Sequence, residues 1–461
     1  MSILIVTFAL VFLMFIAYRG YSVILFAPIA ALLAVLITEP KLVAPVFSGV
    51  FMPKMVDFIK LYFPVFILGA IFGKVIELSG FSKAIVKAAI RLIGKERSIL
   101  AIVVVCAILT YGGVSLFVVV FAVYPFASEL FKAGEIPKRL IPATIALGAF
   151  TFTMDSLPGT PQIQNIIPTT FFNTTTWAAP ILGVIGSVFI LICGLLYLNR
   201  CRKLAINAKE GYGVKLLNEP ATPNEELNIN PLVAILPLLV VGISNLIFTR
   251  LIPFYYGKEF TISLGAKPII IESGKLVAIW AVELALITGI LTVFIFAFRR
   301  VLRNFAEGSK AAVGGALLAS LNTASEYGFG AVIALLPGFT AIAASLEKIP
   351  NPLVNEAITV TTLAGITGSA SGGMSIALAT MSSQFISMAN QLHIPLEVLH
   401  RIASMASGGM DTLPHNGAVI TLLAVTGLTH KEAYKDIFVI TIIKTLAVFV
   451  AIGVFYLTGW Y

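Results

Sequence analysis

The stretch FTMDSLPGTPQ, from Phe152 to Gln162, decides the fold because it interrupts an apolar segment with groups that a membrane helix excludes. It contains an aspartate, hydroxyl side chains and two prolines, Pro158 and Pro161, each of which lacks a backbone N–H. A related stretch, GGMDTLPHN, follows at Gly408–Asn416. Broken backbone at membrane depth is tolerated only where it is packed within protein or lines a water-filled cavity. The two stretches therefore predict two interrupted membrane helices around a polar site.

The composition is that of a membrane protein. The 461 residues are 58% hydrophobic and only 11% charged, and the mean hydropathy is +0.99, whereas about a quarter of the residues of a soluble domain are charged. The net charge of +9 would also suit nucleic-acid binding, but the basic residues lie between apolar runs, where they set membrane topology. We expect an all-α polytopic membrane protein with lipid as its surroundings and no nucleic-acid partner. The three cysteines lack metal-ligand spacing, so no metal site or cofactor is expected.

Apolar runs of about the length of a membrane helix predict ten spans. Seven are uninterrupted, at about residues 2–18, 21–38, 57–79, 177–199, 231–249, 275–298 and 433–458. Three are interrupted, at 138–172, 310–337 and 397–428. Two longer stretches, 98–131 and 354–390, have Gly- and Ser-rich centres and predict helical hairpins that enter the membrane and return. Pairs of ordinary spans joined by short loops fit these two stretches as well. The first run lacks a basic leader and a cleavage site, so we expect it to be a retained span.

A polar linker, residues 200–230, separates a first half, residues 1–199, from a second half, residues 231–461. If the linker is cytoplasmic, twenty of the 31 Lys and Arg residues lie inside and nine, including Arg401, lie outside. Such an excess of basic residues in cytoplasmic loops is the usual pattern. Trp177, Trp280 and Trp460 then fall at the outer interface, and both termini are expected outside.

Three fragments occur in the same order in both halves. GKVIELSGF from Gly73 matches GAVIALLPGF from Gly330, GGVS from Gly112 matches GGMS from Gly372, and DSLP from Asp155 matches DTLP from Asp411. The separations are 257, 260 and 256 residues. Near-constant separations indicate an internal repeat, and the opposite starting sides of the halves make the repeat inverted. Inverted repeats with broken helices are typical of secondary transporters, which bind substrate near the membrane midplane.

The breaks and hairpin centres provide uncharged groups for a ligand. Glycine pairs allow close approach of the backbone, and a half-helix that begins after a break directs N–H groups toward an anion. The candidate substrate-binding residues are Gly112, Gly113, Ser115, Thr153, Ser156, Thr160, Gln162, Gln164, Asn165, Gly372, Gly373, Ser375, Thr412 and Asn416.

Asp155 and Asp411 are the main candidates for ion coupling, because an acid at bilayer depth is costly unless it is neutralised or paired. His415 lies four residues after Asp411 and is expected to share its proton. Glu326, in the stretch NTASEYGFG, is expected at a further polar break. Capping of a half-helix is the alternative role for each aspartate, and the residues leave both roles open. His400 is expected in a loop or at an interface.

Three segments carry a resemblance to a known family. TFTMDSLPGTPQIQNIIPTTFF (Thr151–Phe172), SASGGMSIAL (Ser369–Leu378) and ASGGMDTLPHNGAVITLLAVTGLTHKEAY (Ala406–Tyr434) resemble the gluconate permease (GntP) family, closest to its D-beta-hydroxybutyrate permease branch. The likeness covers essentially the whole chain. It implies an elevator-type homodimer in the bacterial inner membrane that imports a small hydroxy- or sugar-acid anion with protons. With no arginine expected at the site, an acid with one carboxylate is favoured over citrate.

Other functions leave different signals. A sodium-coupled transporter remains open, because sodium binds broken backbone without a motif. An anion channel on the same fold also remains open. An intramembrane aspartyl protease requires two buried aspartates in a Gly-x-Gly-Asp context, whereas here Asp155 follows FTM and Asp411 follows GGM. We therefore do not expect an enzyme.

Overall fold

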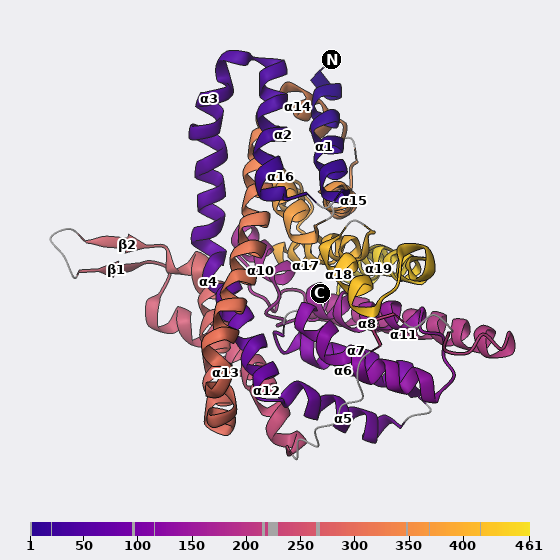
Figure 1. Cartoon of the computed structure of the whole chain (residues 1–461). Helices are drawn as coiled ribbons and strands as arrows, with labels where there is room; N and C mark the ends of the chain where they lie inside the picture. Colours follow the sequence, from indigo (N-terminus) through magenta and orange to yellow (C-terminus); the bar gives the residue numbers. More distant parts are fainter. Residues whose placement is uncertain are drawn as a thin grey trace.

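The computed structural model is almost entirely helical, as the composition predicts (Figure 1). Long helices α4 and α13 pack along each other, and shorter broken helices gather beside them. The structure describes residues 2–19, 21–94, 97–114, 116–213, 217–219, 229–263, 268–346, 349–367, 369–414 and 416–461.

The first half runs from α1 to α11. Its α-helices are α1 (Ser2–Tyr18), α2 (Val23–Thr38), α3 (Val43–Val46), α4 (Met52–Leu78), α5 (Phe81–Ile93), α6 (Ser98–Tyr111), α7 (Leu116–Ala133), α8 (Leu140–Ala149), α9 (Phe152–Asp155), α10 (Ile163–Phe172) and α11 (Pro180–Asn207). The chain turns at Glu39, which is extended (φ −153°, ψ 92°), so α2 and α4 run antiparallel (Figure 1). The short helices η1 (Pro40–Leu42) and η2 (Phe47–Phe51) join α3 and α4 into one helical stretch, Pro40–Leu78. Helices α6 and α7 pack together as the first hairpin.

The second half presents its elements in a corresponding order. They are α12 (Pro231–Tyr256), β1 (Phe260–Ile262), β2 (Ile269–Ile271), α13 (Ser273–Leu335), α14 (Pro337–Leu346), α15 (Pro352–Thr367), α16 (Ala370–Gln391), α17 (Leu396–Gly408), η4 (Gly409–Thr412), α18 (Gly417–Thr426) and α19 (His430–Thr458). The second hairpin, α15 and α16, corresponds to α6 and α7. Helices α17, α18 and α19 correspond to α8, α10 and α11.

Within the described residues, five helical stretches are long and apolar enough to cross a membrane, and shorter apolar helices accompany them. The prediction of a polytopic helical membrane protein is confirmed. One predicted interruption is wrong: α13 has helical backbone from residue 298 to 335, and its sharp bend lies at Ala297 (φ −136°, ψ 24°). Two features were not predicted, the antiparallel ribbon β1–β2 and the extension of α11 to Asn207, which makes the first eight residues of the predicted linker helical.

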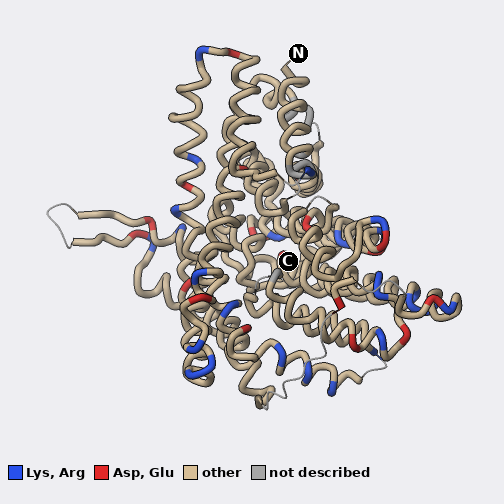
Figure 2. Tube along the Cα trace, in the orientation of Figure 1, with Lys and Arg blue, Asp and Glu red and all other residues tan. Residues whose placement is uncertain are grey.

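After α11, the chain lies across the ends of three other helices. Lys138, two residues before α8, donates to the Leu217 carbonyl at 2.6 Å, and Asn218 donates to the Ala424 carbonyl in α18 at 2.8 Å. Glu219 pairs with Lys138 and with Lys132 at the end of α7. We call described residues 208–213 and 217–219 the strap. Figure 2 shows that Lys and Arg gather along α5, at the lower end of α13 and at the far end of α11.

Candidate functional site

Both helices that carry the repeated Asp–Ser/Thr–Leu–Pro motif are broken. The first break begins where α8 ends, because Thr151 (φ −126°, ψ −128°) lies outside the helical region, and α9 is a single turn. The second break is the passage from α17 through η4 to α18. Asn416 caps α18 by accepting the Ala418 N–H at 2.7 Å. The capping role considered for Asp411 at this half-helix is thus filled by Asn416.

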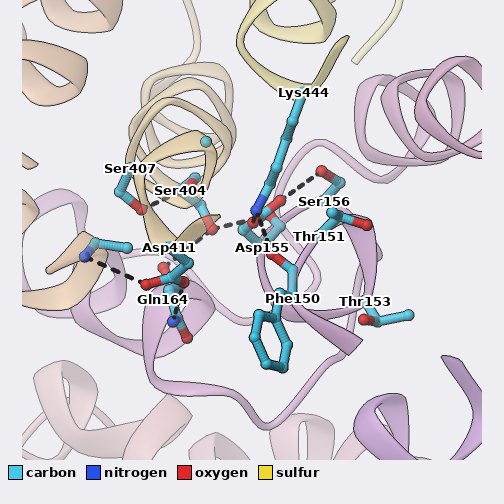
Figure 3. Close-up of polar contacts among 12 residues, drawn as sticks. Phe150, Thr151, Thr153, Asp155, Ser156, Gln164, Ser404, Ser407, Asp411 and Lys444 are labelled. Atoms are coloured by element: carbon cyan, nitrogen blue, oxygen red, sulfur yellow. Dashed lines mark hydrogen bonds and ion pairs between the residues drawn. The ribbon is translucent and has the colours of Figure 1, made fainter. Parts of the chain in front are cut away.

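The carboxylate of Asp155 forms an ion pair deep inside the protein (Figure 3). Its Oδ2 lies 2.5 Å from Lys444 Nζ in α19, and the two side chains are 0% and 1% exposed. Ser156 donates to Asp155 Oδ1 at 2.6 Å, and Lys444 also donates to the Phe150 carbonyl at 3.1 Å. Gly408 makes room for the pair, because a Cβ there would overlap Asp155 Oδ2 and press on Lys444 Nζ. The first half thus supplies the acid and the second half its counter-ion.

Asp411 is held by amide groups instead of an ion pair. Gln164 in α10 donates to its Oδ2 at 2.8 Å, as Figure 3 shows, and Asn416 donates to its Oδ1 at 3.4 Å. The backbone N–H of Ala370, the first residue of α16, lies 3.4 Å from the same Oδ1. Asp411 therefore joins both helix breaks to the tip of the second hairpin.

Arg401 in α17 braces the first break. Its Nη1 donates to the Asp155 carbonyl at 2.8 Å and to Asn165 Oδ1 at 3.0 Å. Its Nε and Nη2 donate to the Ala178 carbonyl at 3.1 and 2.7 Å, and Nη2 also donates to the Thr176 carbonyl at 3.4 Å. All five N–H groups of the guanidinium therefore have acceptors within the protein.

The hairpin tips meet the breaks, and their glycines permit the contact. A Cβ on Gly113 would lie 3.2 Å from Pro161 in the first break, and Gln162 donates to the Thr110 carbonyl at 2.8 Å. In the second hairpin the space beside Gly372 is filled by the carboxyl of Glu326. Glu326 lies in the continuous part of α13, so the predicted polar break around it is wrong, although its side chain does reach a hairpin tip.

Several predicted ligand groups hold the loops together in this structure. Thr153 points away from the aspartates and donates to the Gly148 carbonyl at 2.9 Å (Figure 3). Thr160 donates to the Thr153 carbonyl at 2.8 Å, and Ser375 donates to the Ser371 carbonyl at 2.7 Å. Further predicted residues in such contacts are Asn165, which donates to the carbonyls of Thr160 and Thr176, Thr412, which contacts Thr441, and Gly112, which faces Leu238. Ser115 and His415 lie outside the described residues.

Three residues at the site were missed or misplaced. Arg401 was assigned to an outer loop and His400 to a loop or interface, but both are fully buried. The expectation that no arginine adjoins the site is therefore wrong. Lys444 lies within the predicted span 433–458 and was given no role, although a lysine inside an apolar segment is a functional candidate by default. That signal was present in the sequence.

The geometry suits the binding of an anion together with a cation or proton. Two carboxylates, one ammonium and several amides meet where two broken helices and a hairpin tip converge, which is how secondary transporters build their sites. Among the described residues, no group of three or more His, Cys, Asp or Glu side chains could hold a metal ion.

Comparison with known proteins gives the family. No family model matches the chain. It is 56% identical, over the full length of both proteins, to the uncharacterized transporter YxjC of Bacillus subtilis (strain 168). The crystal structure of the YdaH transporter of Alcanivorax borkumensis has a similar fold, with a TM-score of 0.57, 16% identity and 88% of each chain covered. The chain therefore belongs to the same family of membrane transporters as YxjC.

Proposed function

We propose that this transporter is a secondary active symporter that imports a small hydroxy- or sugar-acid anion together with protons. The observation that carries the proposal is the buried meeting of Asp155, Lys444 and Asp411 at the two helix breaks. Charged groups so deeply buried are costly to a membrane protein and are typical of proton relays and ion pathways. Asp155 and Asp411 are the proposed proton carriers, with Glu326 and His415 as further candidates.

The substrate class follows from the groups at the site and from the sequence resemblance. The N-termini of α16 and α18 lie beside Asp411, and helix N-termini favour carboxylates. Amides and hydroxyls next to them suit hydroxyl groups on the same ligand. The resemblance to gluconate permeases favours (R)-3-hydroxybutyrate or gluconate. A homodimer in the inner membrane, with a cytoplasmic strap and both termini outside, belongs to the same proposal.

Sodium coupling is the second candidate, and one observation favours it. Gln164 donates its amide N–H to Asp411, while its carbonyl Oε1 is buried and has no hydrogen-bond partner among the described residues. A neutral oxygen next to a carboxylate is a ligand that hard cations prefer.

Uptake into proteoliposomes distinguishes proton coupling from sodium coupling. We expect labelled (R)-3-hydroxybutyrate to accumulate against its gradient when an inward pH gradient is imposed without sodium, and collapse of the gradient should stop it. Inhibition by unlabelled gluconate would indicate that the substrates are sugar acids. If accumulation requires sodium, then sodium and not the proton is the coupling ion. Asp155→Asn and Asp411→Asn should each abolish accumulation, and normal accumulation in both variants would contradict the coupling role.

A further inference from the structure

The charges buried at the site cancel. Asp155 and Asp411 supply two negative charges, and Lys444 and Arg401 supply two positive charges, all from side chains that are at most 6% exposed. Because an uncompensated charge in such surroundings is strongly unfavourable, the balance is a property that the transport cycle must preserve.

The neighbouring titratable groups that the structure describes do not alter this balance. On α17, His400 has Nδ1 2.6 Å from Thr174 Oγ1 and Nε2 3.2 Å from Asn165 Oδ1, a pattern that a neutral imidazole satisfies. Glu326 on α13 and Glu356 on α15 are buried and form no ion pair with a described residue, so each is stable as the neutral acid. Tyr111 on α6 donates its O–H to the Pro158 carbonyl and keeps its proton.

The two cations differ in their capacity to bind a ligand. Arg401 has no N–H group left, because all five are directed at protein oxygens. The ammonium of Lys444 has three donors, and the described residues use two of them, through Asp155 and the Phe150 carbonyl. Of these two cations, Lys444 alone has a donor to offer without releasing a backbone carbonyl.

Building on the proposed function, we propose that Lys444 is the residue that binds the substrate carboxylate, and that it does so in exchange for Asp155. A proton from water on the entry side binds Asp155 Oδ2, which ends the ion pair, and the carboxylate of the substrate takes the vacated place on Nζ. On the other side the substrate leaves, Asp155 returns its proton to water, and the ion pair forms again. One proton therefore enters with each negative charge of the substrate, and transport is electroneutral.

Wild-type proteoliposomes test the stoichiometry with (R)-3-hydroxybutyrate and gluconate as probes. We expect accumulation to follow the pH gradient and to be unchanged when valinomycin and potassium set the membrane potential to either sign. Rapid addition of the probe to a supported membrane should then produce no transport current. Accumulation accompanied by current would overturn the exchange and leave the symporter proposal intact. Absence of both uptake and binding for the two probes would overturn the symporter proposal and the exchange with it.

Four variants separate binding from coupling, with binding measured by titration calorimetry in detergent. Lys444→Gln should weaken binding of the probe on the order of 100-fold, the usual effect of removing one partner of a buried charge pair. Asp155→Asn should retain binding but lose its pH dependence, which in the wild type should amount to a tenfold weakening per pH unit, as uptake of one proton requires. The double variant Asp155→Asn/Lys444→Gln leaves no unpaired charge, so it should fold and yet not bind.

Lys435→Gln, at an exposed position on the same helix α19, is the matched control and should behave as wild type. A purely structural role for Lys444 predicts instead that the folded double variant binds as tightly as wild type. That result, or Asp155→Asn with an unchanged pH dependence of binding, would overturn the proposal.

Discussion

At the scale of single residues, the two buried cations of the site have different roles: Arg401 stabilises the fold, and Lys444 keeps a donor for a ligand. Arg401 has all its donors on backbone and amide oxygens that surround the first break, whereas Lys444 has two of three in use. A guanidinium is suited to this bracing because its planar fork can satisfy several carbonyls at once. Arg401 thereby joins Asp155, where the loop begins, to Asn165 in α10 and to the turn before α11.

We expect Arg401→Lys to lower the free energy of unfolding by about 3–5 kcal/mol, because a lysine keeps the charge but leaves buried carbonyls without donors. Thermal unfolding in detergent would show this as a lower midpoint. Arg250→Lys, at an exposed position on α12, is the control and should leave the midpoint unchanged. Equal midpoints for Arg401→Lys and the wild type would contradict the bracing role.

Gly408→Ala should reduce uphill uptake at least tenfold, because the added Cβ would occupy the space of Asp155 Oδ2 and press on Lys444 Nζ. Gly417→Ala, in the same break but with nothing within 4 Å of the added atom, should transport normally. Initial rates of substrate uptake at equal protein content provide the measurement. Equal loss in both variants would point to general damage to the break instead of to the ion pair.

The sequence identified the acids of the site and some of the polar residues that contact them, but not the two cations, Lys444 and Arg401. Asp155 and Asp411 were recognisable because each lies beside prolines in an apolar segment. Arg401 was misplaced because charge counting assigns every basic residue near a span end to a loop, and burial at that point depends on how α17 packs against α10. The pairing of Asp155 with Lys444 joins residues 289 positions apart, and no local pattern encodes it.

At the scale of elements, breaks were predictable where proline forces them and not where polarity alone suggested them. Pro158, Pro161 and Pro414 mark loops in the structure. The polar stretch around Glu326 remains helical, because small residues such as Gly372 in α16 leave space for its carboxyl. The two hairpins were predicted from their length and their glycines, and those glycines do lie where the arms or neighbouring elements approach closely.

Gly373→Ala should destabilise the second hairpin by about 1–3 kcal/mol, the range for overpacking a tight contact. The added Cβ would overlap the backbone of Ala364 in the facing arm α15. Gly453→Ala in α19 has open space around it and should be neutral or stabilising by up to about 1 kcal/mol, since alanine favours helix. Unfolding midpoints of both variants in the same detergent would test the expectation, and equal midpoints would contradict the close approach of the arms.

At the scale of the whole molecule, the strap connects parts of the transporter that are distant in sequence. It contacts α7, α8 and α18, so it holds the first hairpin and both broken helices at one end. Burial would raise the pKa of the Glu219 carboxyl, but hydrogen bonds and ion pairs from Lys132 and Lys138 lower this pKa to about 2. The charged form of Glu219 therefore stabilises the strap.

A carboxyl whose pKa is lower in the folded state than its ordinary value of about 4.3 contributes stability above that value, and loses it as the pH falls toward 2. At pH 6 we expect the free energy of unfolding of the wild type to be higher than that of Glu219→Gln by on the order of 1–2 kcal/mol. This figure allows for the screening of the charges by solvent. The difference should vanish near pH 2. Unfolding midpoints between pH 2 and 6 would test this, with Glu129→Gln at an exposed position on α7 as control. A pH-independent difference would contradict it.

The crossed pairing at the site has an evolutionary consequence. If the halves descend from one duplicated gene, each ancestral copy carried the same acid in the same break. Today Lys444 in α19 is the counter-ion of Asp155. Helix α11, which corresponds to α19, has no basic residue before Arg200, and Asp411 is bound by amides instead. Divergence has thus made the acid of the first half depend on the second half for its counter-ion, and the acid of the second half depend on Gln164 of the first. The two halves expressed as separate chains would together still contain every group of the site.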